Sequence, residues 1–220
     1  SRSTWKWHNS SVHFDDFLLK INSSLVSALP GEIAQLELAP LGRGNLEESM
    51  KNAQNPKYSA VLAMAYPIDS ATNICFIERK AYPGVHSGQI GFPGGKREEE
   101  DNDLMQTALR ETLEEVGVEV SPAQVLGQLS PLYIPPSNFF VQPFIAALER
   151  QPKFIADEIE VERVLEFSLQ ELLDERNLID TQVSVGEQGF KLNTRAFRIG
   201  EHIIWGATAM MVSEIRYMLR

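Results

Sequence analysis

GGKREEEDNDLMQTALRETLEEVGV, residues 94–118, is the stretch of the sequence that decides the expected fold. Asp103 and Gln106 have the D-x-x-Q spacing of a capping box, and Gly117 stands where a C-terminal cap is expected. The segment therefore predicts a helix from Asp103 to Val116. At about 100° per residue, one face of this helix is an apolar arc of Met105, Leu109, Thr112, Leu113 and Val116. We expect this face to pack on a sheet.

Glu111, Glu114 and Glu115 lie on the opposite side of the predicted helix. Like charges at this spacing cost roughly 0.2–0.5 kcal/mol per pair, and no lysine follows at i+4 to neutralise them. Arg110 precedes Glu114 by four residues, so it can pair with that carboxylate and orient it. A solvated surface helix would also be rich in Glu, because Glu is a good helix former. The unbalanced charge and the upstream FPGG turn, whose backbone carbonyl could join the carboxylates, favour a Mg²⁺ site.

The net charge of this 220-residue chain is −10, and much of it is local. Nine acidic residues and one basic residue, Arg110, lie between Glu98 and Glu119, so this segment alone carries −8. The acidic balance argues against a nucleic-acid partner, which would need a basic surface. No apolar run reaches the ~20 residues of a membrane span, and a single cysteine, Cys75, indicates a reducing compartment. We expect a cytoplasmic protein with neither a membrane nor a nucleic-acid partner, and leave a homodimer open.

The rest of the pattern predicts one domain with an N-terminal extension. Residues 12–29 have helical spacing and end at a Pro-Gly pair, whereas residues 32–57 are weakly patterned. Further predicted elements are strands at 58–67, 72–79 and 161–169, a short helix opened by a Ser168–Glu171 capping box, a hairpin of 190–199 with 202–206, and a helix at 207–219. We expect an α/β fold with a mixed sheet and helices on its faces. Residues 1–57 would form a helical extension packed on the core, and residues 58–220 the domain.

The stretch 94–118 resembles the signature of the Nudix hydrolases: a loop that starts with glycine, a helix bearing R-E-x-x-E-E, then a glycine and an apolar residue. Together with the preceding SGQIGFPGG, residues 87–95, it is similar to the coenzyme A pyrophosphatase subgroup of that family. The resemblance holds at the level of motifs over residues 74–118 and extends more loosely over residues 58–215. It implies a Nudix-type α/β/α sandwich with a mixed β-sheet.

The resemblance also implies roles for the residues of the site. Glu111 and Glu115 are expected to be metal ligands, with Glu114 a third ligand or the group that activates water. Arg110 is expected to orient the glutamates, which makes Glu111, Glu114 and Arg110 the expected catalytic residues. The Gly95 carbonyl would complete the site, which the family fills with Mg²⁺ or Mn²⁺. The expected substrate-binding residues are Arg79, Lys96, Gly94 and Gly95.

Two positions depart from the family pattern. Nudix motifs usually place a glutamate eight residues before the arginine, where this chain has Asn102, and Asp101 or Glu99 is the nearest substitute. The coenzyme A subgroup usually has an arginine four residues before the glycine of its GQxxFPGG segment, where this chain has Gly84. Coenzyme A carries a 3′-phosphate besides its diphosphate, so the second departure removes a cation that this substrate would meet.

The resemblance implies a metal-dependent hydrolase of a small-molecule nucleoside diphosphate. The leading interpretation is cleavage of the pyrophosphate bond of coenzyme A or acyl-CoA to adenosine 3′,5′-bisphosphate and (acyl-)4′-phosphopantetheine. The alternatives are a Nudix hydrolase of ADP-ribose, NADH or another nucleoside diphosphate derivative, and a non-catalytic Nudix-like nucleotide-binding module. Three further residues stay open between a role in the site and a structural role, namely His86, Tyr133 and Glu158.

Overall fold

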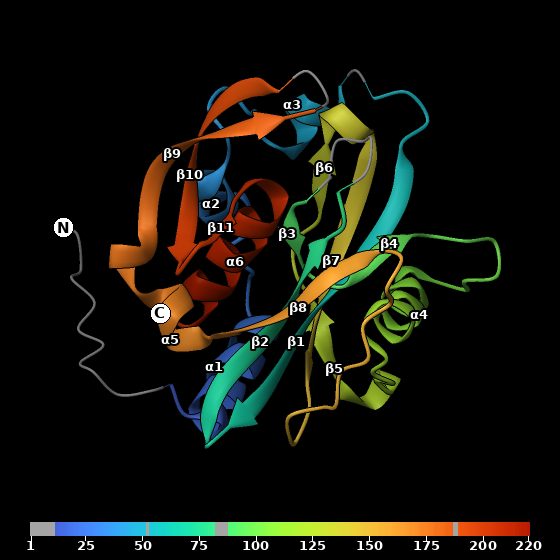
Figure 1. Cartoon of the computed structure of the whole chain (residues 1–220), viewed down its shortest axis with the longest axis vertical. Coiled ribbons are helices and arrows are strands. Elements are labelled where there is room, and N and C mark those ends of the chain that lie inside the picture. Colours follow the sequence, from blue (N-terminus) through green and yellow to red (C-terminus); the bar gives the residue numbers. More distant parts are fainter. Residues whose placement is uncertain (1–11, 52, 82–87, 187–188) are drawn as a thin grey trace.

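The computed structural model describes residues 12–51, 53–81, 88–186 and 189–220. Among these residues, four helical elements precede the first strand: α1 (Phe14–Leu25), α2 (Glu32–Gln35), η1 (Leu36–Leu38) and α3 (Leu46–Met50). α1 buries Phe17 and Ile21 in the same apolar cluster as the C-terminal helix α6 (Gly206–Met218), and α2 also contacts α6. The N-terminal segment thus packs on the body of the molecule (Figure 1). Its separation from a domain that starts at residue 58 stays a prediction.

The main sheet is built on the long strands β1 (Lys57–Ile68), β2 (Ala71–Arg79) and β7 (Phe139–Ala147). Its order is β3-β2-β1-β7-β5, with β3 (Ile90–Gly91) and β5 (Val125–Gln128) at the ends. In addition, β4 (Gly94–Lys96) pairs with β1, β6 (Leu132–Ile134) with β7, and β8 (Val161–Ser168) with β2. β1 and β7 run parallel, whereas β2 runs antiparallel to β1. The sheet is therefore mixed, as predicted.

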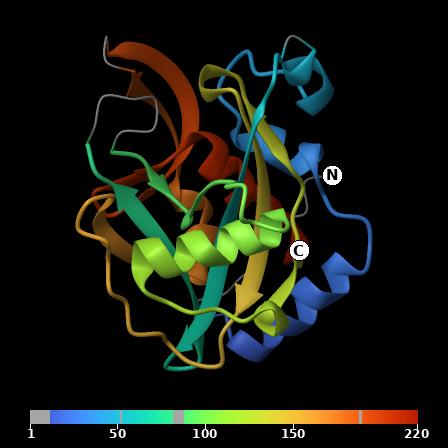
Figure 2. The ribbon, with the colours of Figure 1, turned by 90° about the vertical axis from the view of Figure 1, so that its right-hand side faces the viewer.

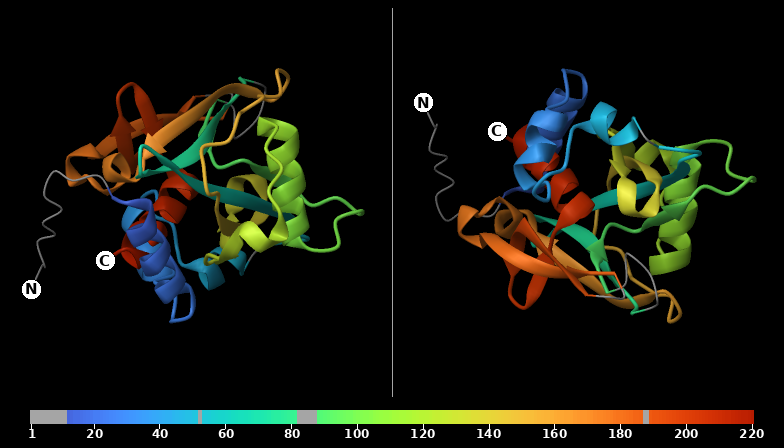
Figure 3. Two further views of the ribbon diagram at one scale, coloured as in Figure 1. Left: turned by 90° about the horizontal axis from the view of Figure 1, so that it is seen from below. Right: turned by 90° about the horizontal axis from the view of Figure 1, so that it is seen from above.

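Helices cover both faces of this sheet (Figures 2 and 3). α4 (Leu104–Val116) lies on one face, against β1 and β4, while α1 and α6 lie on the other face. Each face has its own apolar cluster, one around Phe76 and Phe92 and the other around Leu62 and Met64. This arrangement confirms the predicted α/β/α sandwich.

A second sheet of three strands follows the short helical elements α5 (Leu169–Leu173) and η4 (Glu175–Asn177). Its order is β11-β10-β9, with β9 (Leu178–Val185), β10 (Phe190–Ile199) and β11 (His202–Ile204). The predicted hairpin is confirmed, since Ile199 pairs with His202. The capping box of Ser168 and Glu171 at the start of α5 is confirmed as well. Two 3₁₀ turns, η2 (Pro122–Gln124) and η3 (Pro135–Ser137), complete the fold.

Helix ends show where local sequence signals suffice. α4 follows the N-cap Asp103 and ends at Val116, with Gly117 in the left-handed region at φ 69°, as predicted. α1 is shorter than predicted, because it ends at Leu25 and not near residue 29. Val26 is 88% exposed and Leu29 packs against the apolar cluster from outside the helix, so this turn gains no burial from being helical, and burial supplies most of a helix's stability.

The predicted buried face of α4 is partly wrong. The buried residues of this helix are Thr107, Ala108, Thr112, Glu115 and Val116. Leu113, expected in the apolar arc, is 49% exposed. Small side chains at positions 108 and 112 let the helix approach β1 closely, and this orientation turns Glu115 toward the sheet. Grouping residues by polarity misses this result, because the burial of Glu115 depends on polar partners on β2 and β4.

Candidate active site

Arg110 and Asp101 form the best-defined ion pair of the motif helix. Arg110 Nε and Nη2 donate to the two carboxylate oxygens of Asp101 at 3.0 and 2.9 Å. Asp101 is only 2% exposed and also accepts a hydrogen bond from Thr107 Oγ1 at 2.9 Å. The Arg110 guanidinium holds the pKa of Asp101 well below its usual range. Asp101, and not the exposed Glu99, is therefore the acid that accompanies the motif arginine.

Arg110 also holds two of the three motif glutamates. Its Nη1 lies 3.0 Å from Glu114 Oε2 and 3.2 Å from Glu111 Oε1. Its Nη2 donates to the Lys96 carbonyl at 3.1 Å. The predicted pair of Arg110 with Glu114 is confirmed. Asp101 holds the Nε and Nη2 side of the planar guanidinium in place. The position of Nη1, which contacts both glutamates, is therefore fixed as well.

The expected capping box at the start of α4 is only half formed. Asp103 Oδ1 accepts a hydrogen bond from the Gln106 backbone N–H at 2.8 Å, as predicted. Gln106 Oε1, however, accepts from the Asn102 backbone N–H at 2.8 Å and not from Asp103. This contact with Asn102 stabilises the turn that carries Asp101.

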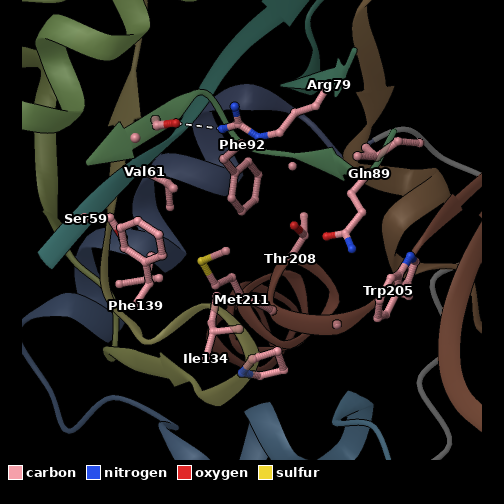
Figure 4. Close-up of a pocket in the computed structure, with 18 of the residues that line it drawn as sticks. Ser59, Val61, Arg79, Gln89, Phe92, Ile134, Phe139, Trp205, Thr208 and Met211 are labelled. Atoms are coloured by element: carbon pink, nitrogen blue, oxygen red, sulfur yellow. Dashed lines mark hydrogen bonds between the residues drawn. The ribbon is translucent and has the colours of Figure 1, made fainter. Parts of the chain in front are cut away.

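Glu115 is the buried member of the motif, at 2% exposure. Its Oε1 accepts from Arg79 Nη1 at 2.9 Å, and its Oε2 accepts from the Gly94 amide at 2.8 Å. Arg79 Nη2 donates in turn to the Gly94 carbonyl at 2.7 Å, the dashed line in Figure 4. Arg79, Gly94 and Glu115 therefore form a closed network that joins β2, β4 and α4.

Glu111 lies directly against Gly95, and this contact requires a residue without a side chain. A Cβ built on Gly95 would lie 2.4 Å from Glu111 Oε1. The backbone here is held by the sheet, since Gly95 pairs with Ala60 of β1. The Glu111 carboxylate thus rests on the backbone of β4, next to the network around Glu115.

Burial changes the acid–base properties of both inward glutamates. Desolvation raises the pKa of Glu115 to about 7, although Arg79 opposes this effect. Desolvation also raises the pKa of Glu111; Arg110 opposes the shift, and the charges of Glu114 and Glu160 reinforce it. Ionising these two carboxylates therefore costs free energy that a bound cation would recover.

The donor groups fit a hard divalent cation. Three carboxylates and the Gly95 carbonyl offer oxygen only, which is the ligand type that Mg²⁺ and Mn²⁺ prefer. Cationic guanidinium groups already stand against all three glutamates. Within the described ranges, no three His, Cys, Asp or Glu side chains converge as a ready-made metal site. The roles of Glu111, Glu114 and Glu115 as metal ligands therefore stay predictions.

These residues line one end of a pocket of about 1060 Å³. Arg79 lies at that end, Phe92 and Met211 lie in the middle, and Ile134 lies on the side away from Arg79 (Figure 4). The pocket thus joins a charged end to an apolar interior. Such a shape suits a ligand with phosphate groups and a less polar remainder.

The remaining candidates from the sequence lie in different surroundings. Lys96 is exposed and lines the pocket. Tyr133 is buried, and its hydroxyl donates to Asn138 Oδ1 at 2.7 Å, so it stabilises the turn after β6. Gly84 and His86 lie outside the described residues.

The loop before β8 contributes acidic residues to the pocket, but not Glu158, the acid considered from the sequence. Asp157 and Glu160 line the pocket, and Glu158 is absent from its lining among the described residues. The Asp157 carboxylate accepts from the amides of Ile159 and Glu160 at 2.7 and 2.9 Å, so it shapes the loop. The charge of Glu160 helps to raise the pKa of Glu111, so Glu160 is the acid of this loop that acts on the motif.

Other parts of the pocket come from segments without a motif. Arg43 belongs to the loop before α3, while Trp205 and Thr208 belong to the start of α6. The sequence gives no direct signal for them, because a lone arginine and an apolar helix are ordinary features of loops and cores. Only the glycines at 42 and 44 indicate an unusual backbone around Arg43.

The chain matches the NUDIX domain model over residues 59–184. The mitochondrial coenzyme A diphosphatase NUDT8 of Mus musculus is 37% identical over 130 residues, which are 58% of this chain and 61% of the mouse protein. The protein of the same name from Homo sapiens is 32% identical over 158 residues, 71% of this chain and 66% of the human protein. The chain thus spans just under two thirds of these relatives. An uncharacterized Nudix hydrolase NudL of Pectobacterium atrosepticum is 28% identical over 181 residues, 82% of this chain and 88% of that protein.

The location of the protein stays a prediction. The mouse and human relatives are named as mitochondrial proteins, which leaves the expected cytoplasmic location untested. No helix among the described residues has both the length and the apolar character needed to span a membrane.

Two solved structures share the fold. A MutT/nudix family protein from Enterococcus faecalis superposes with a TM-score of 0.53 at 16% identity, over 74% of this chain and 61% of that chain. The NUDIX domain of Shewanella oneidensis NrtR, solved with ADP ribose, gives 0.52 at 17% identity, over 80% and 100%. The family match covers more than half of this chain and includes α4 with all three motif glutamates. The chain therefore belongs to the Nudix family.

Proposed function

We propose that this chain is a metal-dependent Nudix hydrolase that cleaves the pyrophosphate bond of coenzyme A or acyl-CoA. Its products are adenosine 3′,5′-bisphosphate and (acyl-)4′-phosphopantetheine. The observation that carries the proposal is the convergence of Glu111, Glu114 and Glu115 with Arg79 and the Gly94–Gly95 backbone at one end of a single pocket. Similarity to two coenzyme A diphosphatases supports this choice of substrate.

The proposed roles follow from exposure and contacts. Glu111 and Glu115, with the Gly95 carbonyl, are the groups that would hold the cation. When bound, Mg²⁺ or Mn²⁺ supplies positive charge for the phosphate oxygens and makes water more acidic. Glu114 is the most open motif carboxylate, with 58% of its side chain exposed. We propose that Glu114 Oε1 accepts the proton of the attacking water, because the other oxygen, Oε2, accepts a hydrogen bond from Arg110.

The substrate diphosphate is assigned to the surface of β4. Gly94 and Gly95 line the pocket together with Arg79 and Lys96, so a phosphate bound there would lie beside two cations. Lys96 is exposed at the end of the same strand, and Arg79 lies beside it. These two cations supply charge-assisted hydrogen bonds to phosphate oxygens. Arg79 does so when its guanidinium is shared between Glu115 and the substrate.

The proposal is tested by incubating the chain with coenzyme A, ADP-ribose and NADH, each with Mg²⁺, with Mn²⁺ and with excess EDTA. The products are identified by mass. We expect adenosine 3′,5′-bisphosphate and 4′-phosphopantetheine from coenzyme A, with turnover lost in EDTA. Preferred cleavage of ADP-ribose or NADH would assign the chain to the alternative substrate class. No turnover of any of the three would overturn the proposal and favour a nucleotide-binding module.

A further inference from the structure

Arg43 is a positive charge of the pocket that no motif explains. It lies in the loop between η1 and α3, flanked by Gly42 and Gly44, and lines the same pocket as the motif glutamates. It lies outside residues 59–184, which match the family. This cation is therefore supplied by the N-terminal segment and not by the Nudix motif.

The loop around Arg43 is anchored at several points. Arg43 Nη2 donates to the Tyr133 carbonyl of β6, and the Leu41 amide donates to the Asn193 carbonyl of β10 at 3.5 Å. Asn45 then caps α3 in a reciprocal capping box with a glutamate. Burial lowers the pKa of the Arg43 guanidinium, which nevertheless stays charged at neutral pH. The loop thus holds a partly desolvated cation at the pocket wall.

Arg43 is fixed on the side of the pocket away from the motif. Its partner Tyr133 is followed directly by Ile134, which Figure 4 shows across the pocket from Arg79. Apolar side chains, among them Phe92 and Met211, lie between the two sides. A group that binds Arg43 is therefore a part of the ligand other than the diphosphate near Arg79.

Among the residues that the structure describes, Arg43 has no partner of opposite charge. Arg79 pairs with Glu115, and Arg110 pairs with acids of its own loop and helix. The hydrogen bond of Arg43 goes to a neutral carbonyl, and within the described residues no carboxylate forms an ion pair with it. Holding an unpaired charge partly out of water is unfavourable, so an anion in the pocket would be stabilised here.

We infer that Arg43 binds a second anionic group of the substrate, remote from the scissile diphosphate, and thereby selects substrates that carry one. The inference rests on the proposed function, since coenzyme A and its thioesters are diphosphates with anions elsewhere. Two groups have the required chemistry: the 3′-phosphate on the ribose and a carboxylate at the end of an acyl chain. Both accept a bidentate contact from arginine. Arg43 then supplies, from another segment, a cation that the sequence lacks at Gly84.

The test compares wild type with Arg43→Gln, Arg43→Lys and the control Lys51→Gln. Lys51 is an exposed cation of the same segment and does not line the pocket. The kcat and KM of each protein are measured for coenzyme A, 3′-dephospho-coenzyme A, butyryl-CoA and succinyl-CoA. Thermal unfolding of each variant checks that the fold is retained. Binding of adenosine 3′,5′-bisphosphate and of AMP to wild type, measured calorimetrically, gives a readout without any variant.

Each source of the anion predicts its own pattern. If Arg43 binds the 3′-phosphate, Arg43→Gln raises KM roughly 10- to 100-fold for the three substrates that carry this group, and much less for dephospho-coenzyme A. Wild type then binds the bisphosphate more tightly than AMP, and Arg43→Lys recovers part of the loss. If Arg43 binds an acyl carboxylate, the increase is confined to succinyl-CoA. Lys51→Gln should match wild type in either case.

Two results would overturn the inference. Equal changes for all four substrates in Arg43→Gln would make Arg43 a support of the pocket wall, and no change for any substrate would remove it from recognition. Failure of the proposed function looks different, because wild type would then cleave none of the four substrates, and the inference would fall with it.

Discussion

Arg79 Nη1 and Glu115 Oε1 lie 2.9 Å apart, in a pair whose side chains are 24% and 2% exposed. The pair connects the end of β2 to the last turn of α4, and both partners also contact Gly94. This contact explains why a motif glutamate points toward the sheet.

Removing Arg79 should destabilise the metal-free protein. Arg79→Met leaves the Glu115 carboxylate buried with only a backbone partner, and we expect a loss of about 2–4 kcal/mol at pH 8. The free energy of unfolding is measured with urea in EDTA and again with Mg²⁺, which should restore part of the loss. Arg163→Met is the matched control, because Arg163 is 53% exposed and its partner Glu78 is less buried than Glu115. Equal effects of the two substitutions would contradict a special role for the buried pair.

The stability of the metal-free protein should carry a pH signature of Glu115. Its pKa is about 7 in the folded protein, whereas an unperturbed glutamate has a pKa of 4.5. Between these values the folded protein holds a proton that the unfolded chain lacks, so this contribution is complete below the lower pKa and is lost as pH rises through 7. Wild type should therefore lose stability relative to Glu115→Gln from pH 5 to 8, by on the order of 3 kcal/mol. A difference that stays constant with pH would refute the shift.

Glu114→Gln should reduce kcat without reducing stability. The side chain is mostly exposed, and loss of the proton acceptor should lower kcat by roughly 10²–10⁴-fold. Steady-state kinetics with coenzyme A and a thermal melt give the two readouts. Glu119→Gln, an exposed glutamate just after the helix that is absent from the pocket lining among the described residues, should behave as wild type. Unchanged kcat in Glu114→Gln would remove Glu114 from the chemistry.

Asp101→Asn should lower activity through Arg110. The substitution weakens the bidentate contact that holds the guanidinium, and supporting contacts of this kind are typically worth about 10–100-fold in activity. Since Arg110 depresses the pKa of Asp101, its stabilising effect is present above the unfolded pKa and is lost as pH falls. The stability difference between wild type and Asp101→Asn should thus shrink in acid. Glu99→Gln, in the same loop but exposed, is the control; if both variants lose equal activity, the assignment is wrong.

The two glycines of β4 should respond differently to alanine. At Gly94, φ is 151° and a Cβ would lie 2.3 Å from the Ala60 carbonyl oxygen, so Gly94→Ala should destabilise the fold by about 2–4 kcal/mol. At Gly95 the Cβ would instead meet the end of the Glu111 side chain, which can move. Gly95→Ala should therefore keep its stability and lose activity. Unfolding curves and kcat separate the two, and a stable, fully active Gly95→Ala would argue against a carboxylate–backbone site.

Local signals in the sequence predict the motif helix well. Three of its features are local: the cap at Asp103, the glycine at 117 and the pair of Arg110 with Glu114. Each joins residues that are at most four positions apart, so the geometry of the helix alone fixes it. A mixed sheet with helices on its faces also follows from the pattern of apolar strands and amphipathic helices, because few arrangements of such elements bury a core; the α/β/α sandwich was implied by the family resemblance. The choice between Asp101 and Glu99 was not predictable, since it depends on the path of a loop.

The sequence by itself predicted the motif helix, the mixed sheet and the acidic residues of the expected site from local patterns, and it indicated the family through the resemblance of its motif. Tertiary structure alone decided the burial of Glu115, which needs Arg79 from β2 and the Gly94 amide from β4. Tertiary structure also decided that Arg43 lines the same pocket as the motif glutamates. These residues are too far apart in the sequence for a helical or strand periodicity to predict this. One physical reason explains the burial of Glu115 and the place of Arg43. Whether a charged side chain can be buried depends on the groups that the fold brings beside it from distant parts of the chain, and a sequence pattern reveals only the neighbours that are close along the chain.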